Sequence, residues 1–155
     1  SLIFILRILK SICFLFVLSF LMACDGDECK DIDCFTPPNY FNFEILDKAS
    51  GKNLYTNGSL RADQLKVFNA VTKAPLDYQF ITENNLNIIV LNSVGWKTEK
   101  TTVTFELKEG MSFNFYVDAE RKYEDCCSFT VFNETKVENT PHEFETSKNL
   151  YSIFF

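Results

Sequence analysis

Short stretches in which apolar and polar residues alternate recur along the chain from residue 40 to its end. The first, residues 41–45 (FNFEI), places an apolar side chain at every second position. A period of two puts those side chains on one face of a β-strand. The same kind of pattern predicts strands at Tyr40–Asp47, Leu54–Thr56, Leu65–Asn69, Tyr78–Thr82, Leu86–Asn92, Thr101–Leu107, Ser112–Asp118, Cys126–Phe132 and Leu150–Phe155.

Some of these stretches also predict which residues are buried. The run Ile88–Leu91 is apolar without a break, which is typical of a central strand covered on both faces. In the two strands that follow, apolar residues alternate with polar ones. Val103, Phe105 and Leu107 share one face, and Phe113, Phe115 and Val117 share another. We expect these side chains to line the core.

Helical spacing of apolar residues is confined to a possible short turn at Arg61–Leu65. Turn signals separate the predicted strands, among them the polar segment Lys48–Asn53 and the pair Asn57-Gly58. About eight or nine short strands with turns every 8 to 12 residues or so indicate an all-β fold, an immunoglobulin-like or related β-sandwich. A closed barrel is the alternative architecture.

The N-terminus follows a different pattern. Arg7 and Lys10 precede an almost wholly apolar run, residues 11–23. This arrangement is typical of a secretory signal, with its charged and apolar regions. A helix that spans a membrane needs about 20 apolar residues, and the run after Lys10 is shorter. We therefore predict that residues 1–23 are a cleaved signal peptide.

The quartet Leu21-Met22-Ala23-Cys24 resembles the bacterial lipobox. The resemblance implies that the thiol of Cys24 carries a diacylglycerol group and that the chain is cut just before this residue. Two or three acyl chains hold a domain on a membrane stably. The expected partner is thus a lipid bilayer, reached through acylated Cys24. The alternative is an ordinary signal peptide followed by a chance cysteine.

Residues 24–38 contain the acidic stretches Asp25–Glu28 and Lys30–Asp33 and end in Pro37-Pro38, and we predict that they form a solvated tether. The acidic residues resemble the export signal of surface lipoproteins of the Bacteroidota, which implies the outer face of the outer membrane. A periplasm-facing location stays open. The aspartates do not follow the EF-hand pattern, so no metal site is expected here.

The predicted domain, residues 39–155, opens with a second resemblance. The segments that show it are Cys34–Pro38, Phe41–Lys48, Gly51–Leu54 and Asn57-Gly58. Together they resemble the opening of small surface or periplasmic lipoproteins of the Bacteroidota. This implies a β-rich domain in a cell-envelope lipoprotein, and it implies no particular activity.

Charge and composition limit the classes of function. The formal net charge of −6 becomes −8 once a leader with two cations and no acids is removed. An acidic surface disfavours nucleic acid as a partner. A hydrophobic fraction of 46% with 17 phenylalanines excludes a chain that is disordered throughout.

Four cysteines remain after Cys13 leaves with the leader and Cys24 is acylated. They are Cys29, Cys34, Cys126 and Cys127. An even number in an exported protein favours two disulfides. Adjacent cysteines rarely bridge each other, so we expect both bonds to join the early pair to the late pair, with the pairing open. A zinc site is disfavoured because adjacent ligands fit tetrahedral spacing poorly.

Catalytic signals are weak. The single histidine, His142, lies in a loop-like stretch without a His-Glu-x-x-His or Gly-x-Ser-x-Gly element. Glu124 and Asp125 are adjacent, which indicates a charged turn more than a carboxylate pair. We predict no enzyme activity and no cofactor; an envelope hydrolase that uses carboxylates is the weakest alternative.

A binding role rests on aromatic residues. Trp96 lies in a turn-like segment and could form, with Tyr78 and Tyr116, a platform for sugar rings or an envelope protein. The alternative is that Trp96 packs across its own hairpin and the tyrosines form cross-strand pairs. An exposed aromatic patch would favour binding, whereas a buried Trp96 would favour a purely structural role. We therefore expect a membrane-anchored binding or scaffold module.

Overall fold

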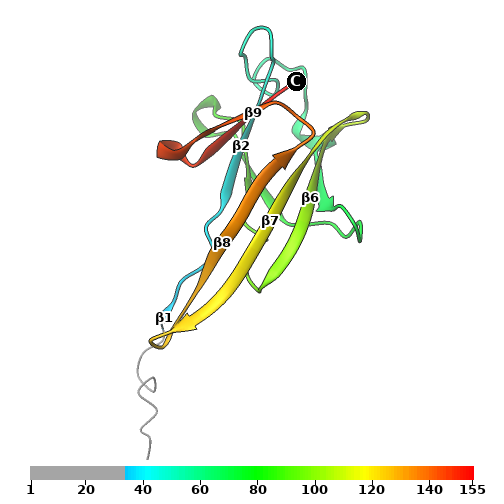
Figure 1. Cartoon of the computed structure of the whole chain (residues 1–155). Helices are drawn as coiled ribbons and strands as arrows, with labels where there is room; N and C mark the ends of the chain where they lie inside the picture. Colours follow the sequence, from blue (N-terminus) through cyan, green and yellow to red (C-terminus); the bar gives the residue numbers. More distant parts are fainter. Residues whose placement is uncertain (1–33) are drawn as a thin grey trace, which may run out of the picture. The chain divides into compact units, whose positions relative to one another are not determined.

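Two five-stranded sheets pack face to face in the computed structural model, which describes residues 34–155 (Figure 1). The first sheet has the order β1 (Cys34–Phe35), β8 (Cys127–Glu138), β7 (Met111–Glu124), β6 (Glu99–Lys108) and β3 (Lys66–Asn69). The second has the order β4 (Tyr78–Ile81), β5 (Ile88–Leu91), β2 (Phe41–Leu46), β10 (Leu150–Phe154) and β9 (His142–Glu145). The predicted all-β sandwich is confirmed.

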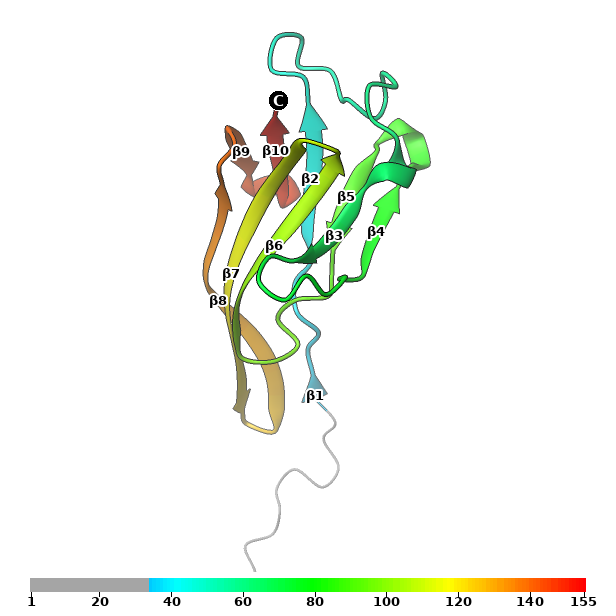
Figure 2. The ribbon, with the colours of Figure 1, turned by 90° about the vertical axis from the view of Figure 1, so that its right-hand side faces the viewer.

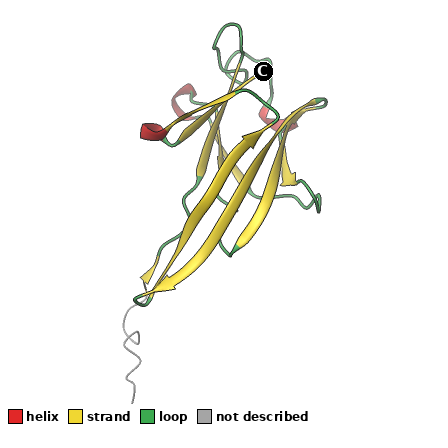
Figure 3. Cartoon of the chain, viewed as in Figure 1, coloured by secondary structure: helices red, strands yellow, loops and turns green. Residues whose placement is uncertain are grey.

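Both sheets are mixed. Strand β1 runs parallel to β8, and β10 runs parallel to β2, whereas the other pairs are antiparallel. The helical segments of the described chain are single 3-10 turns at Ala62–Gln64, Glu83–Asn85 and Thr146–Lys148 (Figure 3). None of the helices within residues 34–155 has the length and apolar character to cross a membrane.

The register of β6 and β7 explains the core. Val103 pairs with Phe115, and Phe105 pairs with Phe113, so the two apolar sets predicted from alternation lie on the same face of the first sheet. Phe43 of the second sheet packs between them, with ring centroids 4.8 Å from Phe105 and 5.0 Å from Phe115. Strand β5 lies between β4 and β2, and consecutive residues Ile89–Leu91 are all buried, as predicted for a central strand covered on both faces.

Several boundaries differ from the predictions. Leu54–Thr56 is a turn, because the Asn53 side chain accepts hydrogen bonds from the backbone amides of Tyr55 and Thr56. His142, expected in a loop, begins edge strand β9. Cys34 and Phe35 form β1, ahead of the predicted domain boundary at residue 39.

The β7–β8 hairpin is longer than the alternation predicts. Its strands have 14 and 12 residues, and they continue past the end of the second sheet (Figures 1 and 2). Asp125 and Cys126 form the turn with φ values of 48° and 66°. Positive φ at both positions matches the twist of the flanking strands. Strand β1 pairs with the start of β8, next to this turn. We call this end of the domain, with β1 and the turn between β7 and β8, the disulfide end.

Candidate functional site

A disulfide joins the first described residue to the β7–β8 hairpin. Cys34 of β1 is bonded to Cys127, the first residue of β8, and the two Cα atoms are 4.4 Å apart. Cys126 is also disulfide-bonded. The adjacent cysteines can be bonded separately because Cys126 lies in the left-handed turn and Cys127 in the strand. The sequence-predicted residues Cys13, Cys24 and Cys29 lie outside the described range.

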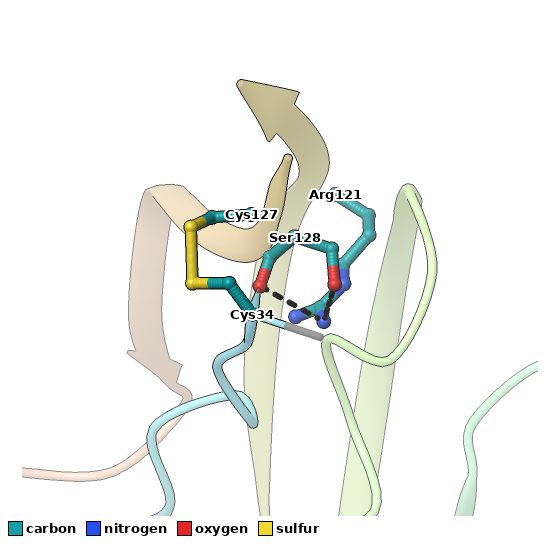
Figure 4. Close-up of a disulfide and its surroundings, with 4 residues drawn as sticks. All are labelled: Cys34, Arg121, Cys127 and Ser128. Atoms are coloured by element: carbon teal, nitrogen blue, oxygen red, sulfur yellow. Dashed lines mark hydrogen bonds between the residues drawn. A yellow bond between two sulfur atoms is a disulfide. The ribbon is translucent and has the colours of Figure 1, made fainter. Parts of the chain in front are cut away.

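Arg121 holds the same end together through hydrogen bonds (Figure 4). One terminal guanidinium nitrogen donates to the Thr36 carbonyl at 2.8 Å and to Thr130 Oγ1 at 2.9 Å. The other donates to Ser128 Oγ at 2.9 Å and to the Ser128 carbonyl at 3.3 Å. The side chain therefore links the segment after β1 to strands β7 and β8, and its terminal donors already have partners.

Exposed aromatic rings lie against this arginine. The ring of Phe35 is 54% exposed, and the ring of Trp96 stacks on it with a centroid distance of 6.1 Å and an angle of 18°. The Arg121 guanidinium carbon lies 4.7 Å from the Phe35 centroid, within the range of a cation–π contact. Trp96 is itself 51% exposed.

Tyr123 extends this apolar area along β7. It is 66% exposed and follows Arg121 by two residues, so both side chains are on the same face of the strand. We call Phe35, Trp96 and Tyr123, with Arg121 among them, the aromatic surface. It lies at the disulfide end.

The loop that carries Trp96 is fixed by its own hydrogen bonds. Trp96 Nε1 donates to the Asn92 carbonyl at 2.8 Å. The Gly95 amide donates to Glu99 Oε1 at 2.9 Å, and its carbonyl accepts from Thr130 Oγ1 at 2.6 Å. The tryptophan is thus held in place before any ligand binds.

Gly95 permits the close approach of this loop to β8. Its φ is +86°, and a Cβ atom at this position would lie 2.7 Å from Cζ of Phe132 and 3.2 Å from Cβ of Pro38. No other residue type fits both the backbone angle and the space. The position of Trp96 therefore depends on this glycine.

The structure does not bring the three predicted platform residues together. Tyr78 packs partly against the core, and its hydroxyl donates to the Leu65 carbonyl at 3.2 Å. Tyr116 alternates with buried Phe115 and Val117, so it lies on the outer face of the first sheet. Trp96 instead has Phe35 as its neighbour. Only the pairing of Cys34 with Cys127 could have placed Phe35 there from the sequence.

No protein-family model, curated protein or solved structure matches the chain. Its function must therefore be inferred from the surfaces of the described domain.

The residues considered for catalysis are scattered. His142 is exposed, with Nδ1 3.1 Å from the Thr140 carbonyl oxygen. Glu124 and Asp125 are exposed at the hairpin turn. Across residues 34–155, no group of three or more histidine, cysteine, aspartate or glutamate side chains is placed to hold a metal ion.

Shifted pKa values occur away from the aromatic surface. Backbone amides of Ser50 and Ala49 donate to the Asp47 carboxylate and lower its pKa. Burial raises the pKa of Tyr55, whose hydroxyl has no hydrogen-bond partner among the described residues. Both effects have local structural causes, so they do not indicate acid–base chemistry.

Proposed function

We propose that the chain is a lipid-anchored protein of the bacterial cell envelope that acts as a binding or scaffold module. The structural observation that supports this most directly is the Cys34–Cys127 disulfide. Structural disulfides form in exported proteins and are rare in the cytosol, where thiols stay reduced. The disulfide therefore agrees with the export that the leader and the lipobox-like quartet predict.

The proposed location is the outer membrane, with Cys24 acylated. The mature chain then begins with the acidic stretch that resembles the surface export signal of the Bacteroidota. That resemblance supports the outer face of the membrane. The periplasmic face is the alternative.

A binding role is favoured over catalysis because the exposed feature with a defined geometry is the aromatic surface. Phe35 and Trp96 are each more than half exposed and stack on one another, and contiguous exposed apolar patches mark interaction sites. Aromatic rings that combine an apolar body with a polar tip are enriched at interfaces.

A second candidate function for the aromatic surface is recognition of a glycan or an envelope protein. The stacked pair Phe35 and Trp96 favours it, since exposed rings can pack on the apolar faces of sugars. Trp96 is the only tryptophan of the chain, so its fluorescence would report such binding directly. Soluble envelope polysaccharide should then shift the emission of the purified protein.

Mass spectrometry of the mature protein from its native host tests the anchor. The expected N-terminal residue is Cys24 with a diacylglyceryl mass, and the Cys24→Ala variant should lack this mass and stay out of the membrane fraction. An uncut leader, or an unmodified thiol at Cys24, would contradict the proposal.

A further inference from the structure

The aromatic surface lies at the end of the domain where the described chain begins. Phe35 follows Cys34 directly, and both pair with the start of β8. Strand β9 and the C-terminus lie at the opposite end (Figure 1). Anything attached ahead of Cys34 is therefore attached at the end that carries the exposed rings.

The sequence limits the distance between this end and the proposed anchor. Nine residues lie between Cys24 and Cys34, so the chain makes ten Cα-to-Cα steps from one to the other. A fully extended chain spans about 3.3 to 3.6 Å per residue, so Cys34 lies within about 36 Å of the lipidated residue. This step rests on the proposed function. The tether length limits how far the disulfide end can lie from the anchor, and it sets no such limit on the β9 end.

The hydrogen bonding of the aromatic surface favours a lipid partner over a sugar. Ligand sites for polar molecules need polar groups that converge on the ligand. Here the terminal nitrogens of Arg121 are taken by Thr36, Ser128 and Thr130. The indole N–H of Trp96 is taken by Asn92. The surface still offers a partner its exposed rings and the hydroxyl of Tyr123.

Such rings match the boundary between lipid and water. Tryptophan and tyrosine are enriched at membrane interfaces, where an apolar ring and a polar tip are both accommodated. Tyr123 combines both features, whereas Trp96, whose N–H is bonded to Asn92, contributes its ring. Phe35, stacked on Trp96, adds apolar area. The nearby acids Glu124 and Asp125 disfavour a strongly anionic leaflet, so the contact is tested on a zwitterionic phospholipid surface.

We propose that the aromatic surface faces the bilayer that holds the lipid anchor, with Trp96 and Tyr123 at the level of the lipid headgroups. The domain then stands with its disulfide end on the membrane and its β9 end toward the solvent. Membrane contact becomes a second attachment in addition to the acyl chains, and it orients the domain.

The test uses the complete mature lipoprotein reconstituted into vesicles of phosphatidylethanolamine and phosphatidylcholine. Emission from Trp96 is measured with phosphatidylcholine brominated on its acyl chains close to the headgroup, and separately with acrylamide in the water. We expect the bromolipid to remove most of the emission and acrylamide to have little effect.

A matched control moves the single tryptophan to the other end. In the variant Trp96→Phe with Phe144→Trp, the indole replaces an aromatic residue of β9 that is 46% exposed and lies 4.4 Å from the Tyr151 ring. Bromolipid should leave its emission unchanged, and acrylamide should quench it.

The outcomes separate the two proposals. Protein that floats with the vesicles while acrylamide, and not bromolipid, quenches Trp96 overturns the membrane contact and leaves the anchor intact. Protection of Trp96 by added envelope polysaccharide, without bromolipid quenching, also overturns it and supports glycan binding. Protein that does not float and carries no acyl mass refutes the anchor, and with it the inference.

Discussion

Strands β7 and β8 line the core at one end and form the disulfide end at the other. Along the inner face of β7 the side chains Phe113, Phe115 and Val117 are buried against the second sheet. Further along the same face come Arg121 and exposed Tyr123. All of these side chains lie on one face of β7, but the second sheet covers only part of that face, because β7 continues past the end of the second sheet (Figure 2).

The two regions are therefore stabilised by different means. Around Phe43, stability comes from apolar burial, which contributes about 25 cal/mol per Å² removed from water. At the disulfide end, hydrogen bonds from Arg121 and a covalent bridge replace the missing apolar cover. Such a region can leave aromatic rings exposed without losing its shape. Substitutions in the two regions should consequently differ in how much they lower the free energy of unfolding and in how much of the domain they affect.

The largest effect is expected in the core. Phe43→Ala removes a ring in contact with Phe105, Phe113, Phe115 and Tyr151, and should reduce the free energy of unfolding by about 3 to 5 kcal/mol. Urea denaturation followed by circular dichroism measures this loss. A loss below about 1 kcal/mol, the size expected for a surface substitution, would show that the core does not dominate stability.

Loss of the disulfides should come next. The Cys34–Cys127 bond closes a separation of 93 residues, and a bridge of this kind contributes about 2 to 4 kcal/mol. Reduction of all disulfides should lower stability by an amount in that range. The double variant Cys34→Ser with Cys127→Ser should lower it much less, because the bond of Cys126 to its predicted partner Cys29 closes nearly the same loop.

Non-reducing peptide maps provide the check on this interpretation. A peptide that joins Cys29 to Cys126 is expected. If the double variant is destabilised as much as the fully reduced protein, the bond of Cys126 does not close an equivalent loop.

A smaller and more local effect is expected at Arg121. Arg121→Gln removes hydrogen bonds between a charged donor and three residues, and should cost about 1 to 2 kcal/mol. Hydrogen exchange should accelerate at the backbone amides of Ser128 and Thr130 and stay slow in β5. The matched control is Lys122→Gln on the outer face, whose ion pair with Glu120 at 3.7 Å should contribute under about 1 kcal/mol. Equal effects of both variants would remove the special role of Arg121.

The smallest effect is expected at Tyr55 in the core. Its buried hydroxyl lacks a partner among the described residues, so Tyr55→Phe should leave stability unchanged or raise it by up to about 1 kcal/mol. Tyr151→Phe is the control, since its hydroxyl lies 3.0 Å from Thr135 Oγ1 and its loss should lower stability by about 1 kcal/mol. Thermal unfolding of the pair measures the difference. A clear destabilisation by Tyr55→Phe would indicate a bound water at that hydroxyl.

Alternation along the chain predicted much of the fold. It placed β2, β3, β4, β5 and β10 within one or two residues of their observed ends. It predicted too short a β7, because apolar alternation fades after Ala119 while the strand continues to Glu124. The polar residues that follow are paired by β8, and a local pattern contains no information on that partner.

The candidate site was predicted less completely. The sequence pointed to Trp96 and to bonds between the early and late cysteines, and the Cys34–Cys127 bond is of this kind. It did not point to Phe35, which belongs to a strand of two residues, too short to show a period. Tyr78 and Tyr116 were grouped with Trp96 because residue type alone does not reveal which face of which sheet a side chain occupies.

By itself, the sequence determined the strand period, the apolar face of each strand and the number of cysteines left to pair. These are local properties, because side chains alternate between the two faces of a strand and the order of neighbouring residues therefore fixes which of them share a face. Only the tertiary structure decided which faces meet. The contact of Phe35 with Trp96 and Arg121 joins β1, a loop and β7, and it depends on pairing between segments far apart in the chain. Long-range pairing of this kind has no signature in the order of neighbouring residues.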